Sequence, residues 1–292
     1  MADPHKRLDT NRPGNFYVDT TCINCDTCRQ LAPRSFEEVG EYSAVVHQPA
    51  GDTEMRQAYR ALLACPTGSI GTEQSDAAWL SETKADFPLP VEDEVYYCGF
   101  NSEKSFGANS FYVRHAGGNW LIDSPRYLKP LVDAFERMGG VAYIFLTHED
   151  DVADAARYAK RFGAKRIIHR KDVHAMPDAE EVIEEFESRL FSPEFTIIPV
   201  PGHTAGSMCL LYRVRFLFTG DHLWWDPEHF RLDSPRQLVW DAAALRQSIA
   251  TLAHHPFEWV LAGHGGRMHL PQLQMKAALR DLVQRREQGG TQ

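Results

Sequence analysis

The sequence predicts an α+β protein in which a small N-terminal domain precedes a larger layered sandwich of sheets and helices. Two observations predict this architecture. Four cysteines in the first 65 residues are grouped as three close thiols and one distant thiol, which is typical of a small domain built around bound metal. Further along, apolar runs occur first as hairpin-like pairs and then alternate with helical patterns, an order that favours strands layered with helices.

The composition sets limits on the class of protein. The chain has 292 residues, 43% hydrophobic and 24% charged, which is ordinary for a globular protein with one large core or two unequal ones. A net charge of -9 and the lack of a long basic run argue against a nucleic-acid partner, and they favour a small-molecule substrate or a protein partner. No secretory signal and no membrane-spanning run is evident, so we expect a cytoplasmic protein. The oligomeric state is not readable.

The first candidate site is a group of thiols. Cys22, Cys25 and Cys28 lie within seven residues, and Cys65 follows at a distance, directly before a proline. Three thiolates this close can bind three corners of a cubane iron–sulfur cluster, with the distant cysteine at the fourth corner. A zinc site more usually takes two separated pairs, and zinc or a purely structural role is the alternative. Because no further cysteine follows closely, the pattern favours a single cluster.

The segments between these cysteines fit a small domain. We expect short strands at 17–19 and 43–47 and a helix at 53–63, capped near Asp52 or Thr53, that delivers Cys65. With its Cys-x2-Cys-x2-Cys run and remote Cys-Pro, the segment 14–72 resembles the single-cluster bacterial ferredoxins. The resemblance implies that Cys22, Cys25, Cys28 and Cys65 bind a [4Fe-4S] cluster. We therefore expect a cluster domain at 1–73, a polar connection at 74–93 and a second domain at 94–292.

The second domain is expected to begin with strands and then to alternate. One helix, from about Asp151, should bury the apolar residues that recur at helical spacing, namely Val152, Ala155, Ala156, Ala159 and Phe162. The expected strands are 95–100, 110–115, 119–123, 141–146, 164–169, 195–200, 208–212, 216–219 and 259–262. The expected helices are 128–138, an acidic helix at 179–186, 237–252 and 270–287.

Four of these apolar strands run into a potential metal ligand: His148, His203, Asp221 and His264. Imidazole and carboxylate are ligand types that zinc, iron and manganese share, and strand-end loops let distant residues meet at one ion. The sequence therefore predicts one divalent metal, Zn, Fe or Mn, where the four strand ends converge. The alternative for each histidine taken singly is a structural role.

The motifs Thr-His148, Gly-His203-Thr-Ala-Gly-Ser, Thr-Gly-Asp221 and Gly-His264-Gly resemble, in order and spacing, those of the metallo-β-lactamase-fold hydrolases. The resemblance covers residues 94–292. It implies a four-layered αββα sandwich and one or two ions that polarise the substrate and activate water. It also implies that His148, His203, Asp221 and His264 are metal ligands.

The first motif departs from the family pattern His-x-His-x-Asp-His. The second His is replaced by Asp150, and the Asp-His pair falls on Val152 and Ala153, which cannot bind metal. A shift of two residues would let Asp154 stand for the family's Asp. Asp150 and Asp154 are therefore candidate metal ligands and candidate catalytic groups.

Three outcomes follow for the metal. One ion could be held by a single ligand set, either His148, Asp150, His203 and Asp221, or Asp154 with Asp221 and His264. Two ions could be held in a weakened site that uses both carboxylates. Finally, the site could hold no metal, in which case the acids are only favoured by the positive end of a helix.

The function predicted first is a metal-dependent hydrolase-like protein with a fused iron–sulfur module for electron transfer or sensing. It would act on an ester, thioester, amide or phosphoester. The alternative is an iron-dependent oxidoreductase fed by the cluster, with a redox partner protein, because a carboxylate in place of the second His also resembles flavodiiron proteins. The third is a non-catalytic redox or sensing protein with a degenerate metal site. Whether the chain is an enzyme is therefore left open.

Overall fold

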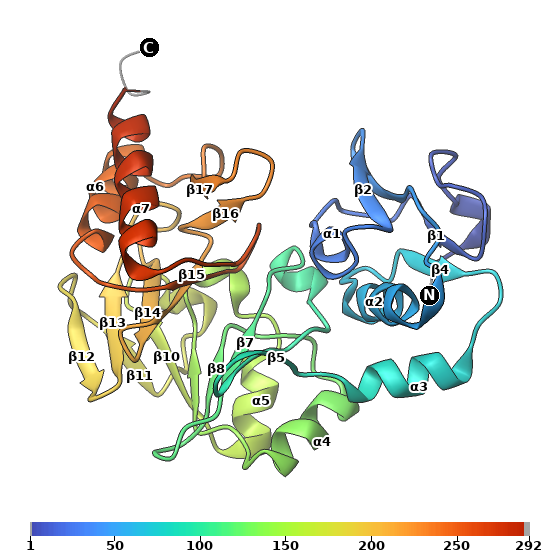
Figure 1. Ribbon diagram of the computed structural model, residues 1–292. Coiled ribbons are helices and arrows are strands. Elements are labelled where there is room, and N and C mark those ends of the chain that lie inside the picture. The colour runs from blue at the N-terminus through green and yellow to red at the C-terminus, as the bar shows by residue number, and fades with distance from the viewer. Residues whose placement is uncertain (1, 289–292) are drawn as a thin grey trace. The chain divides into compact units, whose positions relative to one another are not determined.

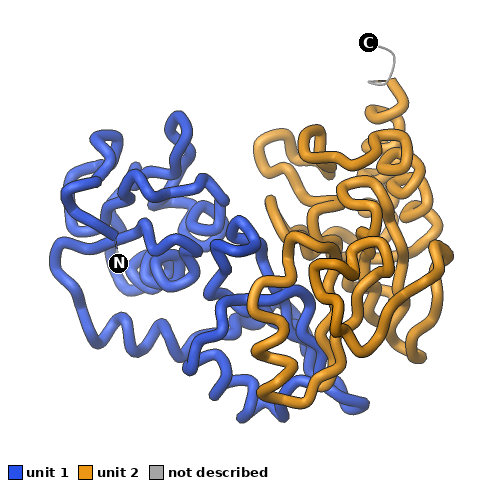
Figure 2. Tube along the Cα trace, turned by 180° about the vertical axis from the view of Figure 1, so that it is seen from behind, with its two compact units in different colours: residues 1–141 blue, residues 142–292 orange. Residues whose placement is uncertain are grey.

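The computed structural model describes residues 2–288 and divides into two compact units, Met1–Val141 and Ala142–Gln292 (Figures 1 and 2). The outermost residues of the predicted domains, 1 and 289–292, lie outside the described part. The first unit holds the whole predicted cluster domain together with residues 94–141 of the predicted second domain. No helix in the described residues is long and apolar enough to cross a membrane.

The cluster domain is built from two small sheets and two helices. The short helix η1 (Pro4–Lys6) precedes β1 (Phe16–Val18), which pairs antiparallel with β4 (Ile70–Thr72), while β2 (Phe36–Val39) pairs with β3 (Tyr42–Val45). Helices α1 (Thr27–Leu31) and α2 (Gly51–Ala64) pack on each other. Their apolar faces enclose a core around the rings of Phe16 and Tyr59, whose centroids are 5.1 Å apart.

The start of α2 differs from the prediction of a cap at Asp52 or Thr53. The residue before the helix is Ala50, whose N–H donates to the Glu54 carboxylate at 3.0 Å. An acid in the first turn therefore satisfies the backbone at this end.

The predicted connection is more ordered than its composition suggested. It contains α3 (Ala77–Ala85), capped by the Asp76 carboxylate, and ends in β5 (Leu89–Glu92). β5 is the edge of an antiparallel sheet that continues through β6 (Val95–Tyr97), β7 (Phe111–Val113) and β8 (Trp120–Ile122). The turn η2 (Glu103–Ser105) lies between β6 and β7. Helix α4 (Lys129–Arg137) packs on this sheet through Phe135, which stacks on Tyr112 with centroids 4.6 Å apart.

The second unit contains two sets of strands. β9 (Tyr143–Phe145), β10 (Lys165–His169) and β11 (Glu181–Ile183) run parallel. Helix α5 (Ala155–Phe162) joins β9 to β10 and contacts β10. The other sheet has the order β12 (Arg189–Ser192), β13 (Phe195–Pro199), β14 (Met208–Tyr212), β15 (Phe216–Gly220), β18 (Trp259–Ala262) and β19 (Met268–His269).

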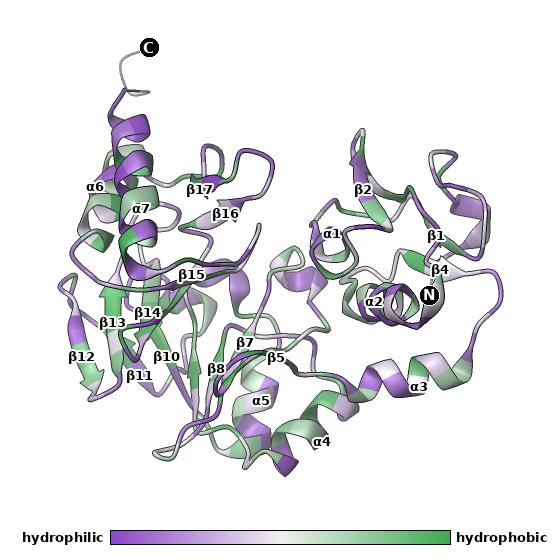
Figure 3. Ribbon diagram, in the orientation of Figure 1, coloured by the Kyte–Doolittle hydropathy of each residue, from purple (hydrophilic) through white to green (hydrophobic). Residues whose placement is uncertain are grey.

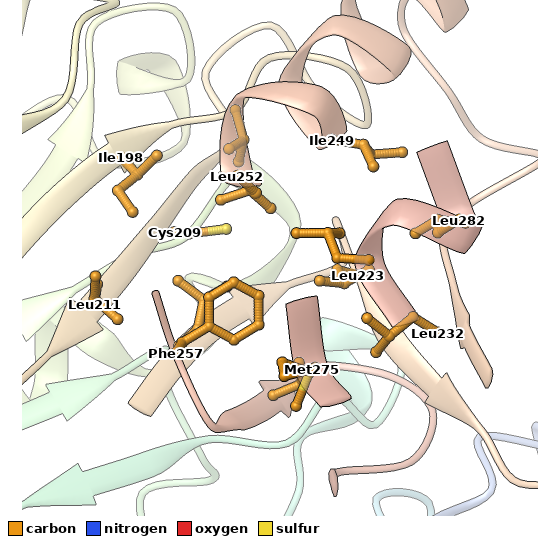
Figure 4. Packing of buried hydrophobic residues seen from close by; sticks show 14 of the residues in the cluster. Ile198, Cys209, Leu211, Leu223, Leu232, Ile249, Leu252, Phe257, Met275 and Leu282 are labelled. Atoms are coloured by element: carbon orange, nitrogen blue, oxygen red, sulfur yellow. The ribbon is translucent and has the colours of Figure 1, made fainter. Parts of the chain in front are cut away.

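Two long helices cover this second sheet. α6 (Ala242–Leu252) and α7 (Gln272–Gln288) lie side by side, and a hairpin of β16 (Trp224–Asp226) and β17 (Arg231–Asp233) packs beside α7 (Figure 1). Ile249 and Leu252 from α6, Met275 and Leu282 from α7, and Cys209 from β14 belong to one apolar core (Figure 4). β13 and β14 are mainly hydrophobic, because a central strand is buried on both faces (Figure 3). Helix α7 shows both hydrophilic and hydrophobic residues, because a covering helix keeps one face in water.

One predicted helix in this unit is wrong, and another starts later than predicted. Residues 179–186 do not form an acidic helix, because Glu181–Ile183 pair with β10 and the buried Arg166 binds Glu180 at 2.7 Å. One acid of the predicted helix, Glu180, is therefore a partner of this buried arginine. Helix α6 starts at Ala242 and not at 237, because the Asp241 side chain accepts the N–H groups of Ala243 and Ala244.

The start of α5 is also different from the prediction. Residues Glu149–Asp151 form a 3-10 turn, η3, and the α-helix begins only at Ala155. Of the residues expected to be buried, Ala155 and Ala159 are buried but Ala156 is exposed, and Tyr158 is buried instead. Because η3 comes before α5, the helix packs inward through Ala155, Tyr158 and Ala159.

Gly220 at the end of β15 allows two strand ends to lie side by side. Its φ is +48°, and a Cβ there would lie 2.3 Å from Thr147 Oγ1. We expect Gly220→Ala to lower the free energy of unfolding by about 2–4 kcal/mol, from left-handed strain plus overpacking. The matched control is Gly163→Ala, where φ is +67° and no atom lies within 4 Å of the new Cβ. Calorimetric unfolding of both variants should give a clearly larger loss for Gly220→Ala, and equal losses would show that Thr147 yields at no cost.

Candidate metal centres

The four clustered cysteines line one pocket of the first unit. Cys22 and Cys25 precede α1, Cys28 lies in its first turn, and Cys65 directly follows α2. Cys28 and Cys65 are buried, and the other two are partly exposed. Between the thiols, Asn24 and Asp26 take left-handed backbone conformations with φ of +54° and +63°, which their short polar side chains tolerate. These two turns let the closely spaced thiols share the pocket.

The donor set of this pocket fits an iron–sulfur cluster. Burial raises the pKa of Cys25 to about 11, although the Thr27 hydroxyl works in the opposite direction, and burial raises the pKa of Cys28 further. Without metal, these thiols are therefore protonated, and iron must displace their protons to bind. Four thiols around one pocket match the four corners of a single [4Fe-4S] cluster.

The second candidate site lies entirely in the second unit, at strand ends. His148 follows β9 and precedes η3, and His203 lies in the loop between β13 and β14. Asp221 directly follows β15, and His264 follows β18 by two residues. Among the described residues, one group of three potential ligands has its atoms within 4.8 Å of one another, and it consists of His148, His203 and Asp221.

The Asp221 carboxylate is the centre of this arrangement. Its Oδ2 lies 3.7 Å from His148 Nε2, 3.8 Å from His203 Nε2 and 3.7 Å from His264 Nε2. The His148 and His203 rings meet edge to face with centroids 4.9 Å apart. Three imidazoles from three different strand ends therefore face one carboxylate oxygen.

Asp150 adds a second carboxylate on the same side. Its Oδ2 lies 3.2 Å from His203 Nε2, within hydrogen-bonding distance, and 3.7 Å from His148 Nε2. The side chain is 46% exposed, so one face of the group opens to solvent. The structure thus brings together His148, Asp150, His203 and Asp221, which is the first of the ligand sets considered from the sequence.

The charges of these groups suit a cation. Burial lowers the pKa of His148, which keeps its imidazole neutral, and the hydrogen bond with His203 lowers the pKa of Asp150. Burial opposes the charged form of His203, but Asp150 and Asp221 outweigh it and its pKa is raised. In the described part of the chain, the buried His148 Nε2 and Asp221 Oδ1 have no hydrogen-bond partner. A divalent ion among these side chains would give His148 Nε2 a partner and would offset the Asp221 carboxylate charge, so the residues fit a metal.

A buried acid that the sequence analysis missed supports both histidine loops. Asp172, which is 1% exposed, accepts the Glu149 N–H at 3.1 Å and the Thr204 hydroxyl at 2.6 Å. It therefore ties the segment after His148 to the segment after His203. Asp172 follows the end of β10 by three residues, so the strand-end argument used for the other ligands could have found it.

Two further acids near His148 have different surroundings. Asp154 lies just before α5, and its carboxylate is 3.8 Å from Arg157 Nη1. Asp151, which the sequence analysis did not select as a ligand, is 1% exposed, and its Oδ2 lies 3.9 Å from His148 Nδ1. The same nitrogen, His148 Nδ1, lies 2.9 Å from Thr147 Oγ1, a hydrogen-bonding distance that fixes the ring orientation.

The aromatic residues near the site have separate roles. Trp225 is 8% exposed and belongs to the core, while Trp240 is 61% exposed. The backbone N–H of Trp240 donates to the His203 carbonyl at 2.9 Å. Leu238, close by in sequence, is 87% exposed. Two exposed apolar side chains, Trp240 and Leu238, therefore lie in a segment that is hydrogen-bonded to the backbone of His203.

Comparison with known proteins gives matches for both parts of the chain. Residues 18–72 match the family model of the 4Fe-4S single cluster domain of Ferredoxin I. The chain is 30% identical over 181 residues to a hydroxyacylglutathione hydrolase of Rhizobium etli, which covers 60% of this chain and 66% of that protein. It is also 30% identical over 148 residues to the protein of the same name from Rhizobium meliloti, a match that covers 49% of this chain and 55% of that protein. The chain thus spans at most about two thirds of the length of these curated relatives.

Among solved structures, the chain is similar to the DIM-1 metallo-β-lactamase exposed to ceftazidime. The TM-score is 0.51 at 15% identity, and the match covers 67% of this chain and 95% of that one. At this identity the likeness concerns the fold, and the metallo-β-lactamase fold predicted from the sequence is confirmed. More particularly, this chain is a fusion in which a ferredoxin-type 4Fe-4S domain precedes a domain of that fold. The predicted resemblance and α+β class are both confirmed.

The two candidate acids can be distinguished by metal binding. We expect Asp150→Ala to weaken zinc binding at the second site at least about tenfold, because its carboxylate faces both His148 and His203. Asp154→Ala is the matched change and should leave the affinity within about twofold. Calorimetric titration of zinc into protein that keeps its cluster but lacks other metal measures both. A loss in Asp154→Ala alone would instead favour the shifted alignment.

Acidification should weaken metal binding at this site. The pKa of His203 is raised, so its imidazolium persists to higher pH than that of an ordinary histidine, and a metal must displace the proton. The zinc affinity should fall by about tenfold per pH unit below that pKa, since one proton competes. In Asp150→Asn the decline should begin at lower pH, because the partner that favours the charged form is gone. An affinity that does not vary between pH 5 and 8 would contradict this assignment.

Proposed function

We propose that the chain is a metal-dependent hydrolase whose single divalent ion, Zn, Fe or Mn, is held by His148, Asp150, His203 and Asp221. The observation that carries the proposal is the convergence of two imidazoles and two carboxylates on one position. Two carboxylates balance the charge of a divalent ion, and all three metals accept this ligand mixture. Val152 and Ala153 stand where the family has further ligands, which supports one ion over two.

The bound ion would supply Lewis-acid chemistry, polarising a carbonyl and activating water. The chain would contribute the groups around it. Asp150, ionised and partly exposed, can accept a proton from the attacking water. The His264 side chain is 30% exposed, and its Nε2 can donate a hydrogen bond to a substrate oxygen. Asp154, beside Arg157, fits a positioning role at the start of α5 better than that of a base.

The first substrate class to test is a thioester of small size. The relatives reported above are named hydroxyacylglutathione hydrolases, so we choose a hydroxyacyl thioester of glutathione as the first compound to assay. The exposed Trp240 and Leu238 near His203 would suit an apolar acyl portion. In this account the substrate is a small molecule, the protein acts in the cytoplasm, and the cysteines hold a [4Fe-4S] cluster. The predicted domain boundaries at 73 and 94 remain part of the proposal.

A second candidate function is an iron-dependent oxidoreductase that exchanges electrons with the cluster through a partner protein. The observation that favours it is Asp150, since a carboxylate beside two imidazoles is a ligand set that iron readily takes. A third reading, a non-catalytic sensing protein, would follow if neither reaction were found.

Hydrolysis is tested by assaying hydroxyacylglutathione and a simple acyl thioester with zinc-, iron- or manganese-loaded protein. We expect Asp221→Asn to lower kcat/KM at least about a hundredfold, because its carboxylate faces three imidazoles. Asp281→Asn, which alters an acid of α7 paired with Arg285, is the control and should be unchanged. If no loaded form hydrolyses any ester, thioester, amide or phosphoester, the hydrolase proposal fails, and iron that changes redox state with the cluster would support the second function.

A further inference from the structure

Residues beyond the predicted cluster domain lie against the cluster pocket. They come from two connections of the metallo-β-lactamase-fold part, between β6 and β7 and between β8 and α4. Both connections belong to the same compact unit as the cysteines. Three of their residues, Asn101, Gly107 and Arg126, contact either a cluster cysteine or a residue next to one in the sequence.

Gly107 packs directly on one of the cysteines. A Cβ at this position would lie 2.7 Å from Cys25 Cβ, 2.9 Å from Cys25 Sγ and 3.0 Å from Pro66 Cγ. The φ of Gly107 is +86°, which a residue with a side chain rarely adopts. Only glycine therefore brings this backbone so close to the thiol and to the proline that follows the fourth ligand.

Asn101, which is fully buried, holds Gly107 in place. Its Nδ2 donates to the Gly107 carbonyl at 2.7 Å and to Thr27 Oγ1 at 3.0 Å, and its N–H donates to the Ala64 carbonyl at 3.1 Å. Thr27 Oγ1 in turn lies 3.4 Å from Cys25 Sγ. One asparagine thus links the β6–β7 connection to the segments that carry three of the cysteines.

Arg126 brings a positive charge to the fourth ligand. Its Nη2 donates to the Leu63 and Cys65 carbonyls, each at 3.0 Å, and so satisfies the C-terminal end of α2. In proteins a guanidinium keeps its positive charge. The charge therefore lies close enough to Cys65 to interact with it electrostatically.

We propose that the metallo-β-lactamase-fold part of the chain completes the cluster site. Asn101 and Gly107 close the pocket on the side of Cys25, and Arg126 tunes the reduction potential of the cluster. This inference rests on the cysteines holding a [4Fe-4S] cluster, but not on hydrolysis at the second site. Its consequence is that the Gly107 contact is needed for the chain to retain its full content of cluster.

Two physical effects follow from these contacts. Covering Cys25 with backbone excludes water and oxidants from the cluster, which slows its loss. A cluster gains one negative charge when it accepts one electron, so a fixed guanidinium nearby favours the reduced form and raises the reduction potential. Asn101 and Gly107 are positioning residues, since they act through Cys25 and Thr27.

The closing role is tested with full-length Gly107→Ala, purified without oxygen. We expect cluster absorbance per chain to fall several-fold and the remaining cluster to bleach faster in air, because the new Cβ displaces Cys25. The control is Gly40→Ala, in the turn between β2 and β3, where φ is +66° and no atom lies within 4 Å of the added Cβ. Far-ultraviolet circular dichroism checks that both variants fold. Wild-type cluster content and bleaching rate in Gly107→Ala would overturn the closing role.

The tuning role is tested by potentiometric titration of Arg126→Gln and Arg126→Lys, followed by electron paramagnetic resonance. Gln keeps a hydrogen-bond donor without charge, and Lys keeps the charge. We expect Arg126→Gln to lower the equilibrium constant for reduction at least about tenfold, which is 59 mV for one electron, and Arg126→Lys to stay near the wild type. A purely structural role would leave both potentials unchanged and would refute the tuning. Because these variants keep the Gly107 contact, this arm decides the proposal if Gly107→Ala does not fold.

Discussion

The contact on which the second site depends is the Asp221 carboxylate oxygen facing three imidazole nitrogens. The histidines come from the ends of different strands, so their meeting requires that the strands keep their register and that the loops stay in place. Gly220 lets the end of β15 approach Thr147, and Asp172 ties the loops of His148 and His203 together. Without a partner, the Asp221 carboxylate and the buried His148 imidazole would be costly to keep away from water, and a cation relieves that cost.

The cluster and the first strands of the larger fold form one structural unit. Asn101 and Arg126, which the sequence assigns to the second domain, donate to the carbonyls of Ala64, Leu63 and Cys65 at the end of α2. The end of α2, which is followed by Cys65, is therefore hydrogen-bonded to the β6–β7 and β8–α4 connections within one compact unit.

Local patterns in the sequence were sufficient for the fold and for the strand ends that carry ligands. The three close cysteines and the Gly- and His-rich strand ends are read without knowledge of the packing. The failures share a physical cause, which is pairing between distant residues. The acids at 179–186 look helical until Arg166 binds Glu180, and Asp172 looks ordinary until Glu149 and Thr204 donate to it. The sequence offers both Asp150 and Asp154 as ligands but cannot select between them. The difference lies in the folded chain, where Asp150 faces His148 and His203 while Asp154 lies beside Arg157.

The central claim is that one ion is bound by two imidazoles and two carboxylates in the second unit. Zinc-edge X-ray absorption of protein that holds its cluster and one added zinc per chain tests it directly. We predict a shell of nitrogen and oxygen atoms at about 2.0–2.2 Å with two imidazole ligands and no sulfur. A sulfur shell at about 2.3 Å would place the zinc at the cysteines, and a fully hydrated ion would show that the residues around Asp221 bind no metal.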